Sequence, residues 1–290
     1  MTYRLFGLEV IRTQHLSPSM ARVTFAGYGE DAGLTSFVSG GLDQSLSLFL
    51  PRPGQSEPVL PPEQEPGAWY LAYRAMPDEE RAVMRSYTVR AQRPEAGEVD
   101  IDFALHEDGG PACVWAEQAT PGDRVKVLGP AEAENSGIRF RLPESAPWLL
   151  LWADETALPA ASAILESLPA GLPVRAFFEV PYAADELSLH TAADLETVWL
   201  ARERGETALD ALRSAEALPA GAPYIWLAGE AGAMKQIRRH LINDRGYHRR
   251  SISFTGYWRR GASEDRLRDE AMAGTPEPEE PEESERSAAD

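Results

Sequence analysis

The spacing of apolar residues changes character between Pro143 and Pro147, near the middle of the 290-residue chain. Before this point, short β-rich runs are broken by turns that contain Pro and Gly, and no long helical pattern separates them. After it, similar runs alternate with helical stretches. The first pattern is typical of an antiparallel β-barrel, and the second of a parallel sheet with helices on both faces. The sequence therefore predicts two domains, a barrel over residues 1–145 and an α/β domain over residues 146–273.

The clearest strand of the first half covers residues 99–106, where apolar residues alternate with polar or small ones. A period of two indicates a strand with one buried face. Other short β-rich runs are also predicted to be strands, at residues 22–25, 45–50, 86–89 and 124–128. The Pro-rich residues 51–67 are expected to form a loop.

In the second half, residues 148–152 form a continuous apolar run, as expected for a strand that is buried on both faces. The last helical stretch ends before Gly246, which suits the position after a helix. The remaining predicted elements are strands at residues 174–180, 198–200 and 224–228 and helices at residues 158–168, 207–217 and 231–245.

The chain carries a formal net charge of −18; six Glu, one Asp and one Arg in its last 16 residues contribute −6, which leaves −12 for the rest. An acidic body repels phosphodiester backbones, so we expect neither nucleic acid nor an anionic membrane as a partner. Residues 274–290 are too polar to bury apolar surface and are predicted to be an acidic, disordered tail.

No stretch approaches the roughly 20 apolar residues that span a bilayer, and the first residues show no secretory pattern. Cys113 is the single cysteine, which excludes an intramolecular disulfide and fits a reducing compartment. We therefore expect a cytoplasmic monomer without membrane insertion. The histidines show no recognisable ligand spacing, so no metal site is expected.

A short segment of the first half combines a cation, an aromatic ring and hydroxyl groups. Residues 85–88 read Arg-Ser-Tyr-Thr, and Val89 and Arg90 follow. Side chains two apart share one face of a strand, and Arg supplies planar, permanently charged donors that suit phosphate. The segment resembles the Arg-x-Tyr-Ser/Thr strand that lies along FAD in flavin reductases of the ferredoxin-reductase type. Alone, it is equally compatible with an exposed strand that carries a surface Arg.

A second segment follows the strand that ends at His106. Gly109, Gly110 and Pro111 precede a short helical stretch that contains Trp115. Backbone N–H groups at a helix start have no intrahelical partner, and the helix dipole favours an anion there. Pro is tolerated in this turn because the missing N–H would have no partner in any case. The pattern indicates a pyrophosphate site, although a plain strand–turn–helix has the same outline.

Three longer segments match a known family in order and spacing. Residues 106–116 read His-Glu-Asp-Gly-Gly-Pro-Ala-Cys-Val-Trp-Ala, similar to the family's His-Gly-Asp-Gly-Gly-Pro-Ala-Ser-x-Trp-Ala. Residues 153–160 read Ala-Asp-Glu-Thr-Ala-Leu-Pro-Ala, where the family begins with Gly, and residues 256–261 contain its Gly-Tyr-Trp-Arg signature. From Arg4 to Arg268, the chain therefore resembles the siderophore-interacting proteins.

This resemblance implies a ferredoxin-reductase-like fold in which the barrel binds FAD and the α/β domain binds NAD(P)H. The implied activity is an FAD-dependent NAD(P)H:ferric-siderophore oxidoreductase, which reduces Fe(III) to Fe(II) and so releases iron in the cytoplasm. Hydride from the nicotinamide would reach flavin N5, and single electrons would pass to the iron. No catalytic side chain is required, because the cofactor carries the chemistry.

The resemblance also implies a set of site residues. Lys235 and Arg259 are candidates to hold the siderophore, although Lys235 could be a solvated surface charge, and Asp154 or Thr156 could cap a helix. The implied cofactor-binding residues are Arg85, Ser86, Tyr87, Thr88, Val89, Arg90, His106, Gly110, Pro111, Ala112, Cys113, Trp115, Asp154, Thr156, Gly229, Glu230 and Ala231.

The chain departs from the family pattern at several positions. Cys113 replaces a Ser hydroxyl expected at the pyrophosphate, and a thiol is a poorer donor. Ala153 replaces a Gly. Ser45 and Ser47 stand where the family's Asp-Gln-His-Val-Lys-Leu has His and Lys. If that Lys holds an anionic siderophore or cofactor in the family, either another cation substitutes for it here or the substrate differs.

The residues leave alternatives open. A reductase on the same scaffold could serve a protein partner or a quinone, and a flavin-free module could bind siderophores without catalysis. Arg202 and Arg204 are candidates to hold the 2′-phosphate of NADPH, but the sequence does not separate NADPH from NADH. It does not identify the siderophore either.

Overall fold

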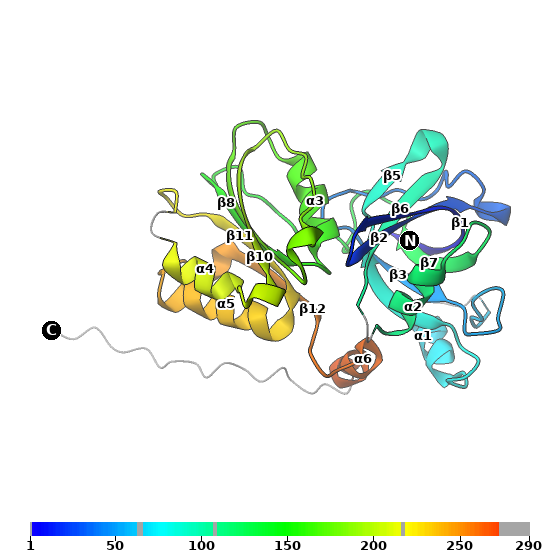
Figure 1. Cartoon of the computed structure of the whole chain (residues 1–290). Coiled ribbons are helices and arrows are strands. Elements are labelled where there is room, and N and C mark those ends of the chain that lie inside the picture. The colour runs from blue at the N-terminus through cyan, green and yellow to red at the C-terminus, as the bar shows by residue number, and fades with distance from the viewer. Residues whose placement is uncertain (1, 63–65, 107–108, 216–217, 273–290) are drawn as a thin grey trace.

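The computed structural model describes residues 2–62, 66–106, 109–215 and 218–272. Two separate sheets lie side by side (Figure 1). The first has seven antiparallel strands in the order β4-β3-β7-β1-β2-β6-β5, and the second has five parallel strands in the order β10-β9-β8-β11-β12. The predicted antiparallel sheet followed by a parallel α/β sheet is confirmed, and the first sheet is a half-barrel.

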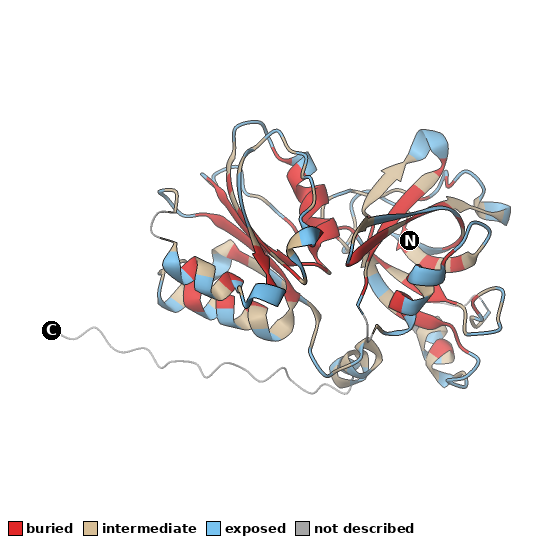
Figure 2. Ribbon diagram, viewed as in Figure 1, coloured by how far each residue is buried: buried red, intermediate tan, exposed pale blue. Residues whose placement is uncertain are grey.

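The half-barrel closes around a core of apolar side chains (Figure 2). In β6 the predicted apolar residues Val99, Ile101 and Phe103 are fully buried, but Asp100 and Asp102 on the other face are buried as well. Arginine partners from neighbouring strands pair with both carboxylates. The elements of this half are β1 (Tyr3–Ser17), β2 (Met20–Gly27), β3 (Ser45–Leu50), α1 (Pro66–Ala75), β4 (Val83–Thr88), β5 (Ala91–Arg93), β6 (Glu98–Ala104), α2 (Pro111–Gln118) and β7 (Arg124–Pro130).

The parallel sheet is covered on both faces, as the alternation of strands and helices predicts. One face packs against α3 and the other against α4 and α5, and every residue of β8 is buried. The elements are β8 (Leu149–Asp154), α3 (Leu158–Ser167), β9 (Pro173–Val180), β10 (Asp194–Ala201), α4 (Ala208–Ser214), β11 (Tyr224–Glu230), α5 (Ala231–Asn243) and β12 (Ile252–Trp258). The last two residues of the predicted helix 207–217 lie outside the described residues.

Buried polar contacts join the two halves. The Asp43 carboxylate accepts hydrogen bonds from the backbone N–H groups of Arg139 and Phe140 at 2.9 and 3.0 Å, and from the indole N–H of Trp226 in β11 at 3.4 Å. Asp185 has no exposed surface and accepts from the Ser19 N–H across the same boundary. Since buried charges persist only when they are paired or hydrogen-bonded, these contacts fix how the sheets face each other.

Two described α-helices were not predicted: α1, which begins within the expected loop 51–67, and α6 (Glu264–Met272). α6 crosses from the α/β half to the half-barrel (Figure 1). It follows β12 in the chain, yet its acidic side chains pair with Arg74 of α1 and Arg85 of β4. The predicted acidic tail, residues 274–290, lies outside the described residues. Among the described helices, none has the length and apolar character needed to cross a membrane.

Candidate functional site

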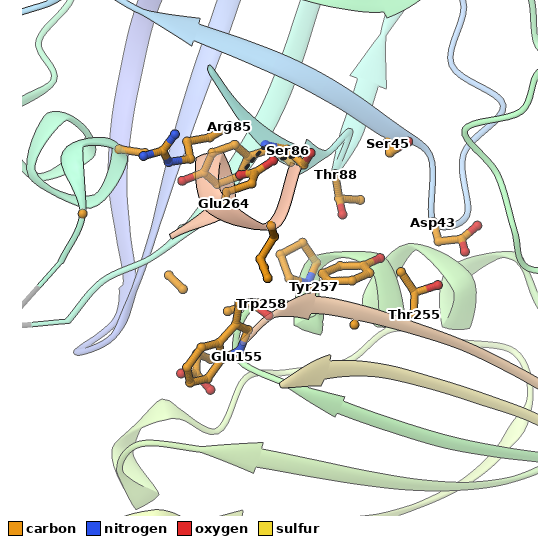
Figure 3. A pocket seen from close by; sticks show the side chains of 18 of the residues that line it. Asp43, Ser45, Arg85, Ser86, Thr88, Glu155, Thr255, Tyr257, Trp258 and Glu264 are labelled. Atoms are coloured by element: carbon orange, nitrogen blue, oxygen red, sulfur yellow. Dashed lines mark hydrogen bonds between the residues drawn. The ribbon is translucent and has the colours of Figure 1, made fainter. Parts of the chain in front are cut away.

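A cavity of about 780 Å³ lies between the two sheets, within the usual size range of cofactor clefts. β4 and the start of α2 form one wall, which we call the barrel wall. The end of β12, with Glu155 and Thr156 after β8, forms the opposite or α/β wall, and α6 lies beside both (Figures 1 and 3). β4 and β12 are each at the edge of their sheet, so the cavity is bordered by two strand edges.

The barrel wall presents the predicted Arg-Ser-Tyr-Thr segment, and all four residues line the cavity. Among the described strands, β4 pairs only with β3, which leaves its outer backbone edge without a partner from that set. The ring of Tyr87 packs on Phe103 of β6, with centroids 4.5 Å apart. Burial raises the pKa of the Tyr87 hydroxyl, so it stays a neutral group. The wall thus offers a guanidinium, two hydroxyls and an aromatic ring along one strand.

The start of α2 completes this wall. Gly110 is the N-cap residue and lines the cavity, whereas Pro111 lines a smaller adjoining cavity. Gly109 is required by packing, because an added Cβ would lie 2.3 Å from the Cys113 sulfur. That thiol accepts from the N–H of His106 at 3.3 Å, and burial raises its pKa. Cys113 therefore acts as a buried neutral thiol that holds the turn.

The α/β wall consists of aromatic rings and strand ends. Thr255, Gly256, Tyr257 and Trp258 line the cavity opposite Arg85 (Figure 3). Burial raises the pKa of the Tyr257 hydroxyl, which keeps it protonated. This wall therefore offers aromatic surface, where the barrel wall offers charge.

Asp154 lies behind the α/β wall and is 2 % exposed. One carboxylate oxygen accepts from the N–H and hydroxyl of Thr156, at 2.9 and 2.6 Å. The other accepts from the Glu230 N–H and the Trp258 indole N–H, both at 2.7 Å. A single side chain thus ties together the ends of β8, β11 and β12. Gly229 is needed beside it, since an added Cβ would lie 2.6 Å from the Asp154 carboxyl carbon.

Burial raises the pKa of Asp154 to about 7, and the neighbouring charge of Glu155 acts in the same direction. The hydrogen bonds from Thr156, Trp258 and Glu230 oppose this rise because they favour the ionised form. Glu155 itself is bridged by Arg202, one of the two residues considered for NADPH, at 2.6 Å. The other, Arg204, is exposed.

The structure brings together about half of the residues implied by the resemblance. On the cavity wall are Arg85, Ser86, Tyr87, Thr88, His106, Gly110, Ala112, Cys113 and Thr156. Within the described part of the chain, the following lie outside that wall: Val89, Arg90, Pro111, Trp115, Asp154, Gly229, Glu230, Ala231, Lys235 and Arg259. Trp115 packs in the barrel core against Phe25 and Phe103, while Arg90 and Arg259 pair with Glu166 and Glu270.

Several wall residues carried no recognisable local signal in the sequence. Arg139 lies in an irregular segment after β7 and donates to the Thr255 hydroxyl at 3.3 Å. Glu264 and Arg268 come from α6, in which six of the nine residues are charged. Of the two Ser residues that replace His and Lys in the family pattern, Ser45 lines the cavity. Ser47 pairs with Ser86 of β4 inside the sheet.

The fold belongs to the ferredoxin-reductase-like class. A ferredoxin reductase of carbazole 1,9a-dioxygenase superposes with a TM-score of 0.60 at 16% identity, covering 89% of this chain and 70% of that one. The two proteins therefore share a fold, in which an antiparallel half-barrel sheet is followed by a parallel sheet domain.

Within this class the chain matches one family in both halves. Residues 9–134 match the siderophore-interacting FAD-binding domain, and residues 146–261 match the siderophore-interacting protein family. Ferric vibriobactin reductase ViuB of Vibrio cholerae is 30% identical over 268 residues, covering 91% of this chain and 92% of ViuB. A siderophore utilization protein from T. fusca is 36% identical, with a TM-score of 0.74 and coverage of 91% and 95%. The chain belongs to the siderophore-interacting protein family, as its motifs indicated.

Proposed function

We propose that this protein is an FAD-dependent NAD(P)H:ferric-siderophore oxidoreductase. The observation that carries the proposal is that two different walls line one cavity. The guanidinium and hydroxyl donors of β4, which suit phosphate, face the aromatic end of β12. A FAD-binding domain match over residues 9–134 and the ferric vibriobactin reductase among the relatives support the same conclusion.

The residues of the barrel wall fit FAD by their chemistry. Arg85 would hold a phosphate, because a guanidinium donates to phosphate oxygens in a fixed planar fork. Ser86 and Thr88 would donate to the polar rim of the flavin ring, and the start of α2 would receive the pyrophosphate. Two carboxylates of α6 already lie against Arg85 and Ser86, so this wall accepts anionic oxygens. When bound, FAD would supply two-electron acceptance from a nicotinamide and one-electron delivery to Fe(III).

The α/β wall would orient the nicotinamide and exclude water from the reacting face. Tyr257 and Trp258 provide apolar surface there, and the hydrogen bond from Trp258 to Asp154 fixes the indole ring. Preorganised geometry of this kind lowers the entropic cost of bringing two reactants together. No side chain needs to transfer a proton for this chemistry.

The ferric siderophore is the substrate, and its iron stays on the chelator until reduction. Lys235 and Arg259, the cations predicted to hold the siderophore, lie outside the cavity wall. We therefore propose that Arg139, which lines the cavity, contacts the anionic siderophore instead. Arg139 is exposed and lies at the cavity beside Thr255. Reduction would release the metal because hard oxygen ligands hold Fe(III) more tightly than Fe(II).

The test is anaerobic reduction of the FAD-loaded protein with NADH or NADPH, followed by mixing with ferric hydroxamate and ferric catecholate siderophores. We expect the flavin absorbance to bleach with a nicotinamide and to return on addition of a ferric siderophore, with Fe(II) captured by ferrozine. A protein that binds no flavin would sink the proposal. Because Ser45 and Ser47 replace a His and a Lys, a quinone is included as a second acceptor. Reoxidation of the flavin by the quinone but not by a ferric siderophore would favour a reductase that serves another electron acceptor.

A further inference from the structure

Two acidic side chains of α6 occupy the donors that the barrel wall offers. Glu264 accepts hydrogen bonds from the Ser86 N–H at 3.0 Å and from the Ser86 hydroxyl at 2.8 Å. Asp265 accepts from the Arg85 guanidinium at 2.9 Å. Figure 3 shows Glu264 beside Arg85 and Ser86 on the cavity side of β4. The backbone edge of β4 and its guanidinium are thus covered by carboxylates from 180 residues away in the sequence.

Asp265 also lies where an anion is favoured. A smaller cavity of about 130 Å³ next to the main one is lined by Arg52, Arg81, Arg85 and Asp265. Pro111, the first residue of α2, borders the same space, so the positive end of that helix lies close by. Among the described lining residues, three guanidiniums therefore surround one carboxylate. This set of donors suits phosphate as well as it suits Asp265.

The attachment of α6 is of a kind that can be released. The helix has no buried residue, in contrast to α3, where eight residues are buried. Arg268 of α6 also donates to the Ser86 hydroxyl at 2.9 Å, and Leu267 and Ala271 line the main cavity. Two further contacts are partly exposed ion pairs, of Asp269 with Arg74 and of Glu270 with Arg259. Exposed ion pairs contribute only about 0–1 kcal/mol each, whereas a buried apolar face would hold a helix firmly.

We propose that α6 is a displaceable acidic plug in which Glu264 and Asp265 compete with FAD for Arg85 and Ser86. The inference rests on the proposed flavin site and adds that the chain regulates its own cofactor affinity. A dinucleotide must release α6 before its phosphate and ring edge reach these donors. A plug that is docked in about nine molecules out of ten weakens the apparent affinity about tenfold.

The experiment compares FAD dissociation constants of the full-length apoprotein and two double variants, measured by quenching of flavin fluorescence. E264Q/D265N removes the carboxylates that touch Arg85 and Ser86, and we expect FAD to bind about five- to tenfold more tightly. E79Q/E80Q removes the same net charge from two exposed residues in the turn between α1 and β4, and it leaves α6 unchanged. It should change the affinity less than about twofold.

Unchanged or weaker FAD binding by E264Q/D265N would overturn the plug, and so would an equal gain in both variants, because general charge repulsion would then explain it. Failure of wild type and variants alike to bind FAD would instead contradict the proposed function. Limited trypsin digestion provides a second readout at Arg266 and Arg268 of α6. FAD should speed cleavage there if the helix is released, and protection of these sites by FAD would contradict the plug.

Discussion

The two walls of the cavity differ in how their polar groups are satisfied. On the barrel wall, the Arg85 guanidinium and the Ser86 hydroxyl donate to carboxylates of α6, a helix without any buried residue. Behind the α/β wall, Asp154 is buried, and its four closest donors belong to Thr156 just after β8 and to the ends of β11 and β12. Groups whose partners are exchangeable can bind a ligand, whereas groups whose partners are internal hold the frame. Affinity and stability are therefore expected to depend on different walls.

The largest expected effect is on the α/β wall. Asp154→Ala leaves the buried N–H groups of Glu230, Thr156 and the Trp258 indole without their acceptor, and we expect the free energy of unfolding to fall by at least about 3 kcal/mol. Urea denaturation monitored by tryptophan fluorescence measures it. Glu264→Ala is the matched change on the barrel side and should cost less than about 1 kcal/mol. Equal losses in the two variants would remove the distinction between the walls.

FAD affinity, in contrast to stability, should depend on the barrel wall. Arg85→Ala removes a charged phosphate contact worth about 1.5–3 kcal/mol, so FAD binding should weaken roughly 10- to 100-fold while the unfolding free energy stays nearly constant. Arg90→Ala is the control, since Arg90 belongs to the same sequence motif but does not line the cavity and pairs with Glu166. Full retention of FAD by a folded Arg85 variant would show that this strand does not hold the phosphate.

The sequence predicted the barrel wall better than the α/β wall because the former is a local motif. Four consecutive residues of β4 and the turn before α2 carry it, and both lie on the cavity as expected. On the α/β side, the family resemblance implied that Asp154 contacts the cofactor. Its carboxylate instead accepts hydrogen bonds from β11 and β12, which lie far away in the sequence. No local pattern shows that a carboxylate will point inward between three strand ends.

Some helices and strands were not predicted from the sequence for similar reasons. β1 is 15 residues long, but register shifts at Val10/Arg12 and His15/Ser17 disturb its alternation, so no strand was predicted there. α6 lacks an apolar stripe, and its position follows from ion pairs to Arg74 and Arg85, which lie far away in the sequence. β8 and β11 were predicted because burial on both faces gives each a continuous apolar run, whereas β12 is partly exposed and was not predicted.

The pH dependence of stability provides a finer test of the α/β wall. The pKa of Asp154 is about 7 in the folded protein and has an ordinary value of 3.8. Between these values the folded state retains a proton that the unfolded state has released, so stability falls as the pH rises from about 4 to about 7. We expect this component of the slope to disappear in Asp154→Ala. If both proteins show the same dependence on pH, other groups cause it.

The smallest expected effect is on the KM for the ferric siderophore. It distinguishes Lys235, the substrate residue predicted from the sequence, from Arg139, the residue that the structure places on the cavity. Arg139 lies on the cavity wall, whereas Lys235 of α5 does not belong to the described wall. Arg139→Ala should raise the KM for an anionic ferric siderophore a few-fold, at unchanged rates of flavin reduction by the nicotinamide, because one exposed charge contact contributes about 0.2–1 kcal/mol. Lys235→Ala should have less effect on this KM.

Salt provides the check on mechanism. An exposed charge contact is screened over about 8 Å at physiological ionic strength, so the difference between wild type and Arg139→Ala should shrink as salt is added. A loss that persists at high salt would mean that the variant has altered the shape of the cavity through the lost contact with Thr255. If Lys235→Ala raises the KM and Arg139→Ala does not, the substrate enters from the α5 side. The original sequence-based assignment of Lys235 would then be correct.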